Sequence, residues 1–582
     1  MMNMLKKILV LVLLSSSCLM QSQIKKSPLT ETFNMSIPQE KTYIQTNTNL
    51  LLAGEYLYYK VYCLEEKTGT YSKISKLAYV ELVGSNNNVV FKHKLKLENS
   101  NAQGDFFIPS TILTGNYKLI VYTNWSKNKA YNSFYEHDIY ILNPFTTEVQ
   151  KIISSKTKMD TVIVQQSNTI EDSVIYTPEL KLSTNKEIYN TRQKATVTLT
   201  SDNYKTHRGN YSLSIRKLDS IEIIKGFKLK SSVIKTPDDI FYLPELRGEI
   251  ISGKIKALNA SSVANIAVTL SIPGKDYIFK IVQTNAEGQF FFNIREDYNS
   301  SSVIIQVQEP NKEDYKIVID EKIFNNYDYL NFSGLELNPN IKSWLEQRNI
   351  RNQIENAYFA VKSDSILQNK LNDESFFYPI ATAYVLDDYT RFNTVKETFV
   401  EIITTASLIK KDGDNKFVLF GNKNTEIDDA STHLNPLILV DGLVIQNNED
   451  IINYSAKNIE SISIVNSNYI YGSKFFDGII AFVTKKGDFK ISKNSKHLKQ
   501  IELKSPLNEK LYYMPNYNKK LNRIPDFRNQ LLWKPNVILN EDEVTIEFFT
   551  SDNVGKYSVK LEGYTVEGVH ITNTKNIIVS NK

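Results

Sequence analysis

The side chains of this chain that suit catalysis or metal binding are few, and they are scattered along the sequence. Asp387 and Asp388, in the segment YVLDDYTRF, have the chemistry of a metal site or of an acid and base pair. Adjacent carboxylates on a strand or loop point apart, however, and no third ligand is near in the sequence. We therefore interpret this pair as structural or solvated.

A second acidic fragment, Asp412-Gly413-Asp414, lies in the segment KKDGDNK. A calcium-binding loop that begins in this way also needs a suitably spaced glutamate at its twelfth position. That glutamate is absent here, so the fragment predicts a turn.

No sequence motif of a known catalytic class is present. The chain has no HExxH, GxSxG, P-loop or CxxC pattern. Its six histidines contain no pair at metal-ligand spacing; they are His93, His137, His207, His433, His497 and His570. We therefore expect a non-enzymatic protein without a cofactor or a bound metal, although residues distant in the sequence can meet in a folded site.

The two cysteines belong to different parts of the chain. Residues 1–22 have the pattern of a secretory signal peptide, because Lys6 and Lys7 precede an apolar run and small or polar residues follow it. That run is too short to span a bilayer. Cys18 is then either removed with the leader or lipidated, and both readings stay open. Cys63 remains alone, so no intrachain disulfide is expected; its place in the alternating run YYKVYC predicts a buried apolar residue.

Composition favours a large β-rich protein of several domains. The chain has 582 residues, with 34 tyrosines and 28 phenylalanines, and aromatic residues favour strands. Its formal net charge is +5, which becomes 5 − 2 = +3 once a leader with Lys6 and Lys7 is removed. This charge is small for the length and no basic block stands out, so nucleic acid is not an expected partner.

The chain is organised around the stretch 436–486. An apolar run ends at Asp441-Gly442, a pair that predicts a hairpin turn between apolar segments. A helix-tolerant segment, Glu449–Lys457, precedes the strand-like sequence IESISIV. Two further turns follow, at Tyr471-Gly472-Ser473 and at Asp477-Gly478. The pattern predicts a small α/β unit of short buried strands and tight glycine turns.

The pieces PLILVDG, IESISIV, YGS, DGII and TKKG occur in an order and spacing that resemble the plug domain of TonB-dependent outer-membrane receptors, especially the SusC-like branch. The resemblance covers residues 395–488. A receptor places a β-barrel after its plug, and such a barrel has about 22 strands of roughly 9–11 residues each. Only 582 − 488 = 94 residues follow here, so we expect a plug-like domain without its own barrel.

Residues 38–145 predict a β-sandwich, because turn signals recur about every ten residues between alternating strands. The pieces KTYIQT, AGE, AYVEL, GDFFIP and GNYKLIVYTNW resemble the macroglobulin domains of bacterial α2-macroglobulin-like proteins. Trp125 ends the last of these pieces. A ligand-stacking role is one reading of this tryptophan, but its place at a strand end favours a core anchor.

Three further segments follow in the chain. A polar stretch, 150–178, is predicted to be a linker. Residues 179–240 predict a second macroglobulin-like sandwich, because TNKEIYNTRQKA resembles the beginning of the first one. Residues 243–325 contain the piece TNAEGQFFF, and this piece resembles the turn and strand of carboxypeptidase-regulatory-like domains. Those domains are small non-catalytic β-sandwiches. Asn285 stands where that family usually has Asp, and either residue can occupy a tight turn.

Residues 339–394 are predicted to be a helical and connecting segment. Apolar residues recur there at three- and four-residue spacing, which predicts one amphipathic helix with Arg and Glu on its other face. Residues 500–582 predict a C-terminal β-sandwich, whose pieces LLWKP and FFTSDNVGKY resemble the closing domain of the same plug-containing proteins. The expected fold class is therefore mainly β and multidomain: several Ig-like or macroglobulin-like sandwiches, one α/β plug-like domain and one amphipathic helical segment.

These resemblances imply a binding and scaffold protein of the cell envelope, exported to the periplasm or associated with the outer membrane. Its membrane association would come through a partner or through a lipid on Cys18. The plug-like domain would dock to an outer-membrane barrel or to a secretion or transport protein. No TonB box is recognisable after the leader. The candidate interaction turns are Asp441, Gly442, Tyr471, Gly472, Ser473, Asp477 and Gly478; each glycine can equally serve only to permit a tight turn.

Two other functions stay open. A macroglobulin-like protein that interacts with proteases or defends the envelope would expose a bait-like segment, for which 150–178 is the candidate. The thioester motif Cys-Gly-Glu-Gln of protease-trapping macroglobulins is absent. An enzyme acting on glycans would need two carboxyl groups about 5–9.5 Å apart at a cleft, which a sequence cannot show.

Overall fold

The structure is a computed structural model of the 582-residue chain. Residues 1–22 with Cys18, and most of the predicted linker 150–178, lie outside the described residues. The described residues are 37–129, 134–146, 161–166, 180–224, 241–259, 262–320, 327–367, 375–411, 413–420, 434–491, 495–517 and 523–581.

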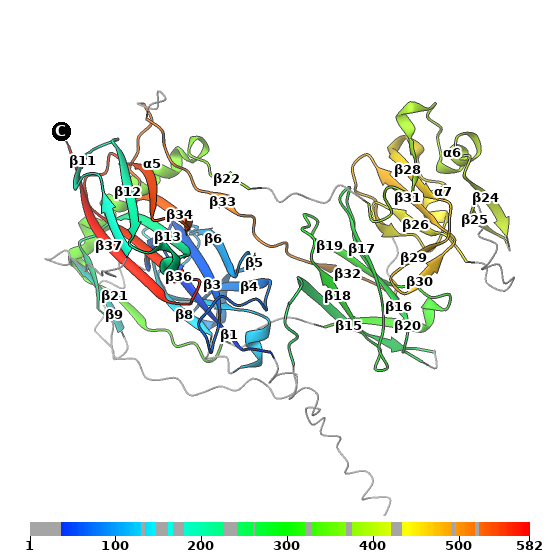
Figure 1. The fold of residues 1–582 in the computed structure, drawn as a ribbon, viewed down its shortest axis with the longest axis horizontal. Helices are drawn as coiled ribbons and strands as arrows, with labels where there is room; N and C mark the ends of the chain where they lie inside the picture. The colour runs from blue at the N-terminus through cyan, green and yellow to red at the C-terminus, as the bar shows by residue number, and fades with distance from the viewer. Residues whose placement is uncertain are drawn as a thin grey trace, which may run out of the picture.

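The chain is mainly β and multidomain, as predicted. Three β-sandwiches, one small α/β unit and the helix α5 (Lys342–Ala357) contain most of the described elements. Figure 1 shows two groups: two sandwiches lie together with α5, and the third sandwich lies with the α/β unit. Among the described residues, no helix combines the length and the apolar character needed to cross a membrane.

The first sandwich has two sheets whose alternate residues point inward and form one apolar core. Cys63 and Trp125 are fully buried, as predicted, and the Trp125 indole donates to the Pro38 carbonyl at 3.0 Å. In sheet order, the strands are β1 (Glu40–Thr46), β3 (Tyr56–Glu65) and β6 (Asn101–Phe107), and then β2 (Leu50–Leu52), β8 (Tyr135–Leu142), β7 (Gly115–Tyr122), β4 (Leu77–Gly84) and β5 (Asn88–Lys96).

The second sandwich joins two segments that the sequence analysis assigned to separate domains, 179–240 and 500–582. Its sheets have the orders β10-β12-β35 and β11-β37-β36-β13-β34. The earlier segment supplies β10 (Leu180–Thr184), β11 (Ile188–Asn190), β12 (Lys194–Ser201) and β13 (Gly209–Lys217). The later segment supplies β34 (Gln530–Leu539), β35 (Glu543–Phe549), β36 (Gly555–Thr565) and β37 (His570–Ser580).

These two segments form one domain because neither covers its own apolar face. On β12, Ala195, Val197 and Leu199 are buried, and they share one core with Phe548 and Val559 of the later segment. Strand β12 pairs with β35 in an unbroken antiparallel register. Each half therefore supplies the layer that the other half needs, which corrects the expectation of two separate sandwiches.

The third sandwich contains the turn on which its predicted resemblance rests: the Asn285 amide oxygen accepts backbone N–H groups of Glu287 at 3.1 Å and Gln289 at 2.8 Å. The last strand of this sandwich follows the α/β unit in the sequence. The α/β unit is therefore an insertion between two strands of the third sandwich. In sheet order, the strands are β18 (Gln289–Ile294), β15 (Glu249–Ala257) and β20 (Tyr315–Ile319), and then β17 (Ile278–Gln283), β16 (Ala267–Ile272), β19 (Ser302–Val307) and β32 (Leu498–Glu502).

The α/β unit has a five-stranded sheet with two short helices and two hairpins around it. The turn predicted near Gly413 connects one of these hairpins. The sheet order is β23 (Thr382–Val385), β28 (Ile459–Val465), β31 (Ile479–Thr484), β26 (Leu437–Val440) and β27 (Leu443–Val444). The other elements are α6 (Val395–Glu401), α7 (Glu449–Ile452), the hairpin of β24 (Ala406–Lys411) with β25 (Asp414–Leu419), and the hairpin of β29 (Tyr469–Tyr471) with β30 (Lys474–Phe476).

Strand β16 shows how the α/β unit is held on the third sandwich. All six residues of its sequence AVTLSI are buried, as expected for a strand with both faces covered. Val268 and Leu270 belong to the core of the sandwich. Ala267 belongs to a second apolar cluster, with Leu439 and Ala481 of the α/β sheet. The two domains therefore pack through a shared apolar interface.

The predicted helix is present as α5, but its buried face is partly polar: only Leu345 of its three buried residues is apolar. Arg348 and Asn352 are buried, whereas Ile350 is 58% exposed. Arg348 was expected on the solvent face. It is buried because its guanidinium pairs with the carboxylates of Glu55 and Asp219, partners that the helical period cannot reveal.

Part of the predicted linker is a strand. Strand β9 (Thr161–Gln166) pairs antiparallel with β14 (Ile221–Ile224) and parallel with β21 (Gly334–Leu337). Its run of four β-branched residues, Thr161 to Val164, is a local strand signal that the surrounding polar residues obscured. The remaining elements are α4 (Tyr204–His207) and the pair β22 (Ser365–Ile366) with β33 (Lys510–Leu511).

Candidate functional site

The first of the predicted interaction turns is buried inside the α/β unit. Asp441 is fully buried at the end of β26, with a φ of 48°. Its carboxylate accepts hydrogen bonds from the Thr484 backbone N–H at 2.7 Å, the Thr484 hydroxyl at 2.6 Å and the Phe489 N–H at 3.1 Å. The Asp441 side chain therefore connects the end of β26 to the end of β31.

Three other predicted residues lie against the third sandwich. A Cβ on Gly442 would come within 2.3 Å of the Tyr277 side chain, and one on Gly472 within 2.8 Å of the Ile281 carbonyl oxygen. The Tyr471 hydroxyl donates to the Phe279 carbonyl at 2.7 Å, and the two rings are stacked at 5.5 Å. These turns therefore contact the neighbouring domain of the same chain.

The last three predicted residues have different surroundings. Ser473 is exposed, and Asp477 is half-buried with its backbone N–H donating to the Asn435 carbonyl at 3.3 Å. Gly478 is buried with a φ of 126°, and a Cβ there would come within 2.1 Å of the Val465 carbonyl oxygen. The glycine at this position thus permits a close backbone approach.

The outward face of the α/β unit carries two residues that the sequence analysis missed. Ile470 and Phe475 stand opposite each other on the β29–β30 hairpin and are 63% and 59% exposed. The other face of this hairpin rests on the third sandwich through Tyr471 and through an ion pair of Lys474 with Glu309 at 3.0 Å. Alternation in the sequence YIYGSKFF would have placed the two apolar side chains on the face opposite the tyrosines.

The acidic and histidine residues that the structure describes do not form a cluster that could hold a metal ion. Asp387 pairs with Arg391 and with Lys485, the latter at 3.6 Å, and the hydrogen bond from Arg391 lowers the pKa of Asp387 below its usual value. Within the part of the chain that the structure describes, which leaves out His433, no group of three His, Cys, Asp or Glu residues is arranged to hold a metal ion.

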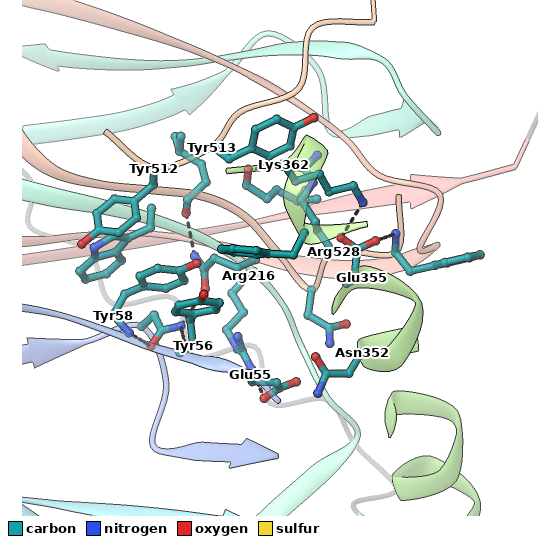
Figure 2. A pocket seen from close by; sticks show the side chains of 18 of the residues that line it. Glu55, Tyr56, Tyr58, Arg216, Asn352, Glu355, Lys362, Tyr512, Tyr513 and Arg528 are labelled. Atoms are coloured by element: carbon teal, nitrogen blue, oxygen red, sulfur yellow. Dashed lines mark hydrogen bonds and ion pairs between the residues drawn. The ribbon is translucent and has the colours of Figure 1, made fainter. Parts of the chain in front are cut away.

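A cavity of about 150 Å³ lies where the first two sandwiches meet α5. Figure 2 shows aromatic side chains at one end, including Tyr56, Tyr58 and Tyr512, and charged side chains at the other, including Glu355 and Lys362. These residues come from β3, α5, the segment that follows α5 and the chain next to β33. The cavity is therefore formed only when distant segments pack together.

An ion-pair network closes the floor of this cavity. Arg348 donates to both oxygens of Glu55 at 2.8 Å and to Asp219 at 2.6 Å. Burial alone would lower the pKa of Arg348, but Asp219 and Glu55 outweigh it and raise that pKa above its usual value. Arg216 approaches Glu55 at 3.7 Å, and burial lowers the pKa of Arg216. The side chains of Arg348 and Glu55 are buried in this network, whereas the Asp219 side chain is 24% exposed.

No protein-family model matches the chain, and no curated protein matches it. Among solved structures, Salmonella α-2-macroglobulin reacted with methylamine aligns with 94% of this chain and 40% of that chain, at 9% identity and a TM-score of 0.24. Escherichia coli α-2-macroglobulin activated by porcine elastase aligns with 93% of this chain and 44% of that chain, at 9% identity and a TM-score of 0.22.

A third solved structure, dimeric latent PorU from Porphyromonas gingivalis, aligns with 52% of this chain and 34% of that chain, at 10% identity and a TM-score of 0.16. The chain thus spans less than half the length of each of these proteins. Similarities this remote do not identify a family for the chain.

Proposed function

We propose that the chain is a non-enzymatic binding and scaffold protein of the bacterial cell envelope. Its plug-like α/β unit docks to an outer-membrane barrel that belongs to a transport or secretion complex. The observation that carries this proposal is the exposed pair Ile470 and Phe475, which stands on a hairpin within the segment that resembles a receptor plug.

The hairpin has the physical properties of a docking element. Exposed apolar side chains gain roughly 25 cal/mol per Å² when a partner covers them. Because Tyr471 and Lys474 already hold the hairpin on the third sandwich, little further ordering is needed on binding. Aromatic and aliphatic anchors of this kind commonly dominate the energy of an interface.

The placement of the α/β unit also supports docking. The unit is an insertion in the third sandwich, and Figure 1 shows it at the end of the molecule away from the first two sandwiches. Among the described strands, β23 pairs only with β28. Its other edge is available to a strand from a partner.

The test is an affinity purification from the detergent-solubilised envelope, using a C-terminal tag and mass spectrometry of the co-purifying proteins. We expect the wild-type chain to recover an outer-membrane barrel and the double variant Ile470→Asp, Phe475→Asp to lose it. Ile538→Asp is the matched control, because Ile538 is also 59% exposed but belongs to the second sandwich. Recovery of the barrel by the double variant would refute docking through this hairpin.

The alternative is a protein that interacts with proteases through a bait-like segment at 150–178. In the structure, residues 161–166 of that segment are paired on both sides as β9, a conformation that resists cleavage. Recovery of no membrane protein, together with clean proteolytic cleavage within 150–178, would favour this alternative over docking.

A further inference from the structure

We infer that the cavity between the first two sandwiches and α5 is a binding site for a neutral sugar ring. The cavity lies in the other group of domains from the α/β unit (Figure 1). The inference is therefore independent of the proposed docking function.

One wall of the cavity is a row of aromatic rings. The rings of Phe359, Tyr56, Tyr58 and Trp533 follow one another with centroid separations of 6.1, 5.7 and 6.2 Å and interplanar angles of 15°, 11° and 20°. Tyr512 meets Tyr58 edge-on at 4.8 Å. Each pair in the row is stacked, so neighbouring rings cover part of each other's faces. The uncovered part of an aromatic face carries partial negative charge and attracts the polarised C–H groups of a sugar ring.

Two residues that line the cavity each carry a buried donor without a hydrogen-bond acceptor among the described residues. These donors are the Arg216 Nη2 and the Trp533 Nε1. The Arg216 Nη2 lies 3.7 Å from the Glu55 carboxylate, which is too far for a hydrogen bond. A buried donor without an acceptor is costly, so both atoms favour a ligand that carries oxygen acceptors, as sugar hydroxyl groups do.

The charged groups of the cavity favour a neutral ligand. Glu55, Glu355 and Asp364 supply three negative charges, and Arg216, Lys362 and Arg528 supply three positive ones, so the formal sum is 3 − 3 = 0. The carboxylates already have partners: Arg348 for Glu55, Lys362 for Glu355 at 2.7 Å and the Tyr513 N–H for Asp364 at 2.8 Å. A charged ligand would leave one charge uncompensated in a partly buried site.

The size of the cavity limits the ligand to one ring at a time. A cavity volume of about 150 Å³ is of the order that accommodates a single six-membered ring. Amide side chains of Asn352 and Asn356 line the same space; each already donates one N–H to a backbone carbonyl, and each amide has further donor and acceptor capacity. The aromatic row, the unsatisfied donors and the balanced charges together select a neutral polyhydroxylated ring.

Saturation-transfer NMR on the purified exported chain tests this inference. The probes are glucose, galactose, mannose and N-acetylglucosamine as neutral sugars, with glucuronate and glucosamine as charged ones. We expect saturable transfer to the ring protons of at least one neutral sugar and weaker transfer to both charged sugars. Absence of saturable transfer to every neutral sugar, or equal transfer to the charged sugars, would overturn the inference.

Variants locate the binding in this cavity. Tyr58→Ala should raise the dissociation constant about tenfold or more, because it removes a ring from the centre of the row. Tyr389→Ala is the matched control, since Tyr389 is an exposed tyrosine of the α/β unit, and it should leave binding unchanged. Unchanged affinity in a folded Tyr58→Ala would place any sugar elsewhere.

Trp533→Phe provides a test that does not depend on the folding of Tyr58→Ala. It keeps a six-membered aromatic ring at the end of the row and removes the five-membered ring of the indole together with its N–H. We expect this variant to weaken sugar binding about fivefold while the thermal melting curve is preserved. Full affinity in this variant would contradict a ligand oxygen at the Trp533 Nε1.

Discussion

The Asp441 carboxylate accepts two hydrogen bonds from one residue, Thr484: from its backbone N–H at 2.7 Å and from its hydroxyl at 2.6 Å. Asp441 directly follows β26 and Thr484 ends β31, and these strands pair in parallel. The side chain therefore joins the ends of two neighbouring strands that have no turn between them. An aspartate expected to form an interaction surface has a structural role in the α/β sheet.

Asp441→Ala should lower the local unfolding free energy of the α/β sheet by about 2–4 kcal/mol, because it leaves buried donors without an acceptor. Hydrogen exchange of peptides that cover β26 and β31 measures this local value. Asp388→Ala is the control: that aspartate is exposed, so its loss should change the free energy by less than about 0.5 kcal/mol. Equal protection in the two variants would contradict the structural role.

Gly442→Ala should loosen the contact between the α/β unit and the third sandwich. The added Cβ would come within 2.3 Å of the Tyr277 side chain, at a position whose φ is 78°. Gly413 has a similar φ of 91°, and a Cβ there would have nothing within 4 Å of it, so Gly413→Ala controls for backbone strain alone. We expect Gly442→Ala to cost about 1–3 kcal/mol more than its control.

The melting temperatures of these two glycine variants, together with hydrogen exchange on β17 and β27, measure the difference. Faster exchange at both strands only in Gly442→Ala is the expected result. Indistinguishable behaviour of the two variants would show that the Tyr277 contact does not hold the domains together.

Arg348→Met should destabilise the group formed by the first two sandwiches and α5. It removes the main partner of the buried Glu55 carboxylate and of the partly exposed Asp219 carboxylate. Breaking a buried ion pair typically costs about 3–5 kcal/mol. Trp344 provides a fluorescence signal, because its indole donates to Asp219 at 3.0 Å and its ring lies 5.1 Å from the Arg348 guanidinium. Urea unfolding followed by this fluorescence gives the free energy.

Lys342→Met is the matched control for this prediction, since Lys342 is an exposed cation on the same helix. It should leave the urea midpoint nearly unchanged. A midpoint of Arg348→Met as high as that of the control would mean that the buried ion pairs contribute no net stability.

Glu562 should make stability depend on acidic pH. Burial raises the pKa of Glu562, but His570 and Lys560 outweigh it and hold the pKa at about 2, below the ordinary 4.5. Between these values the unfolded chain binds more protons than the folded one. The stabilisation from Glu562 is therefore complete above about pH 4.5 and is lost as the pH falls through 2.

The measurement is the difference in unfolding free energy between wild type and Glu562→Gln, from urea titrations between pH 2 and pH 7. We expect this difference to shrink by roughly 3 kcal/mol as the pH falls across the window. Glu567→Gln, at an exposed glutamate in the turn between β36 and β37, should show no such trend. A difference that stays constant from pH 7 to pH 2 would contradict the lowered pKa.

Local sequence pattern determined which residues form strands, turns and helices. The alternation in YYKVYC predicts the buried Cys63, and a strand-end position predicts the core role of Trp125. The apolar spacing after residue 339 predicts α5. These features are visible because a strand repeats every two residues and a helix every 3.6, so burial of one face leaves a period in the sequence.

The tertiary structure alone decided which faces cover one another. β12 and β35 are far apart in the chain yet adjacent in one sheet, and Arg348 is buried on a helix whose period placed it in solvent. The row of rings from Phe359 to Trp533 is likewise formed by residues of distant segments, and no sequence motif predicts that these segments are in contact. Hydrophobic burial is non-directional: it requires that an apolar face be covered but does not specify by which segment.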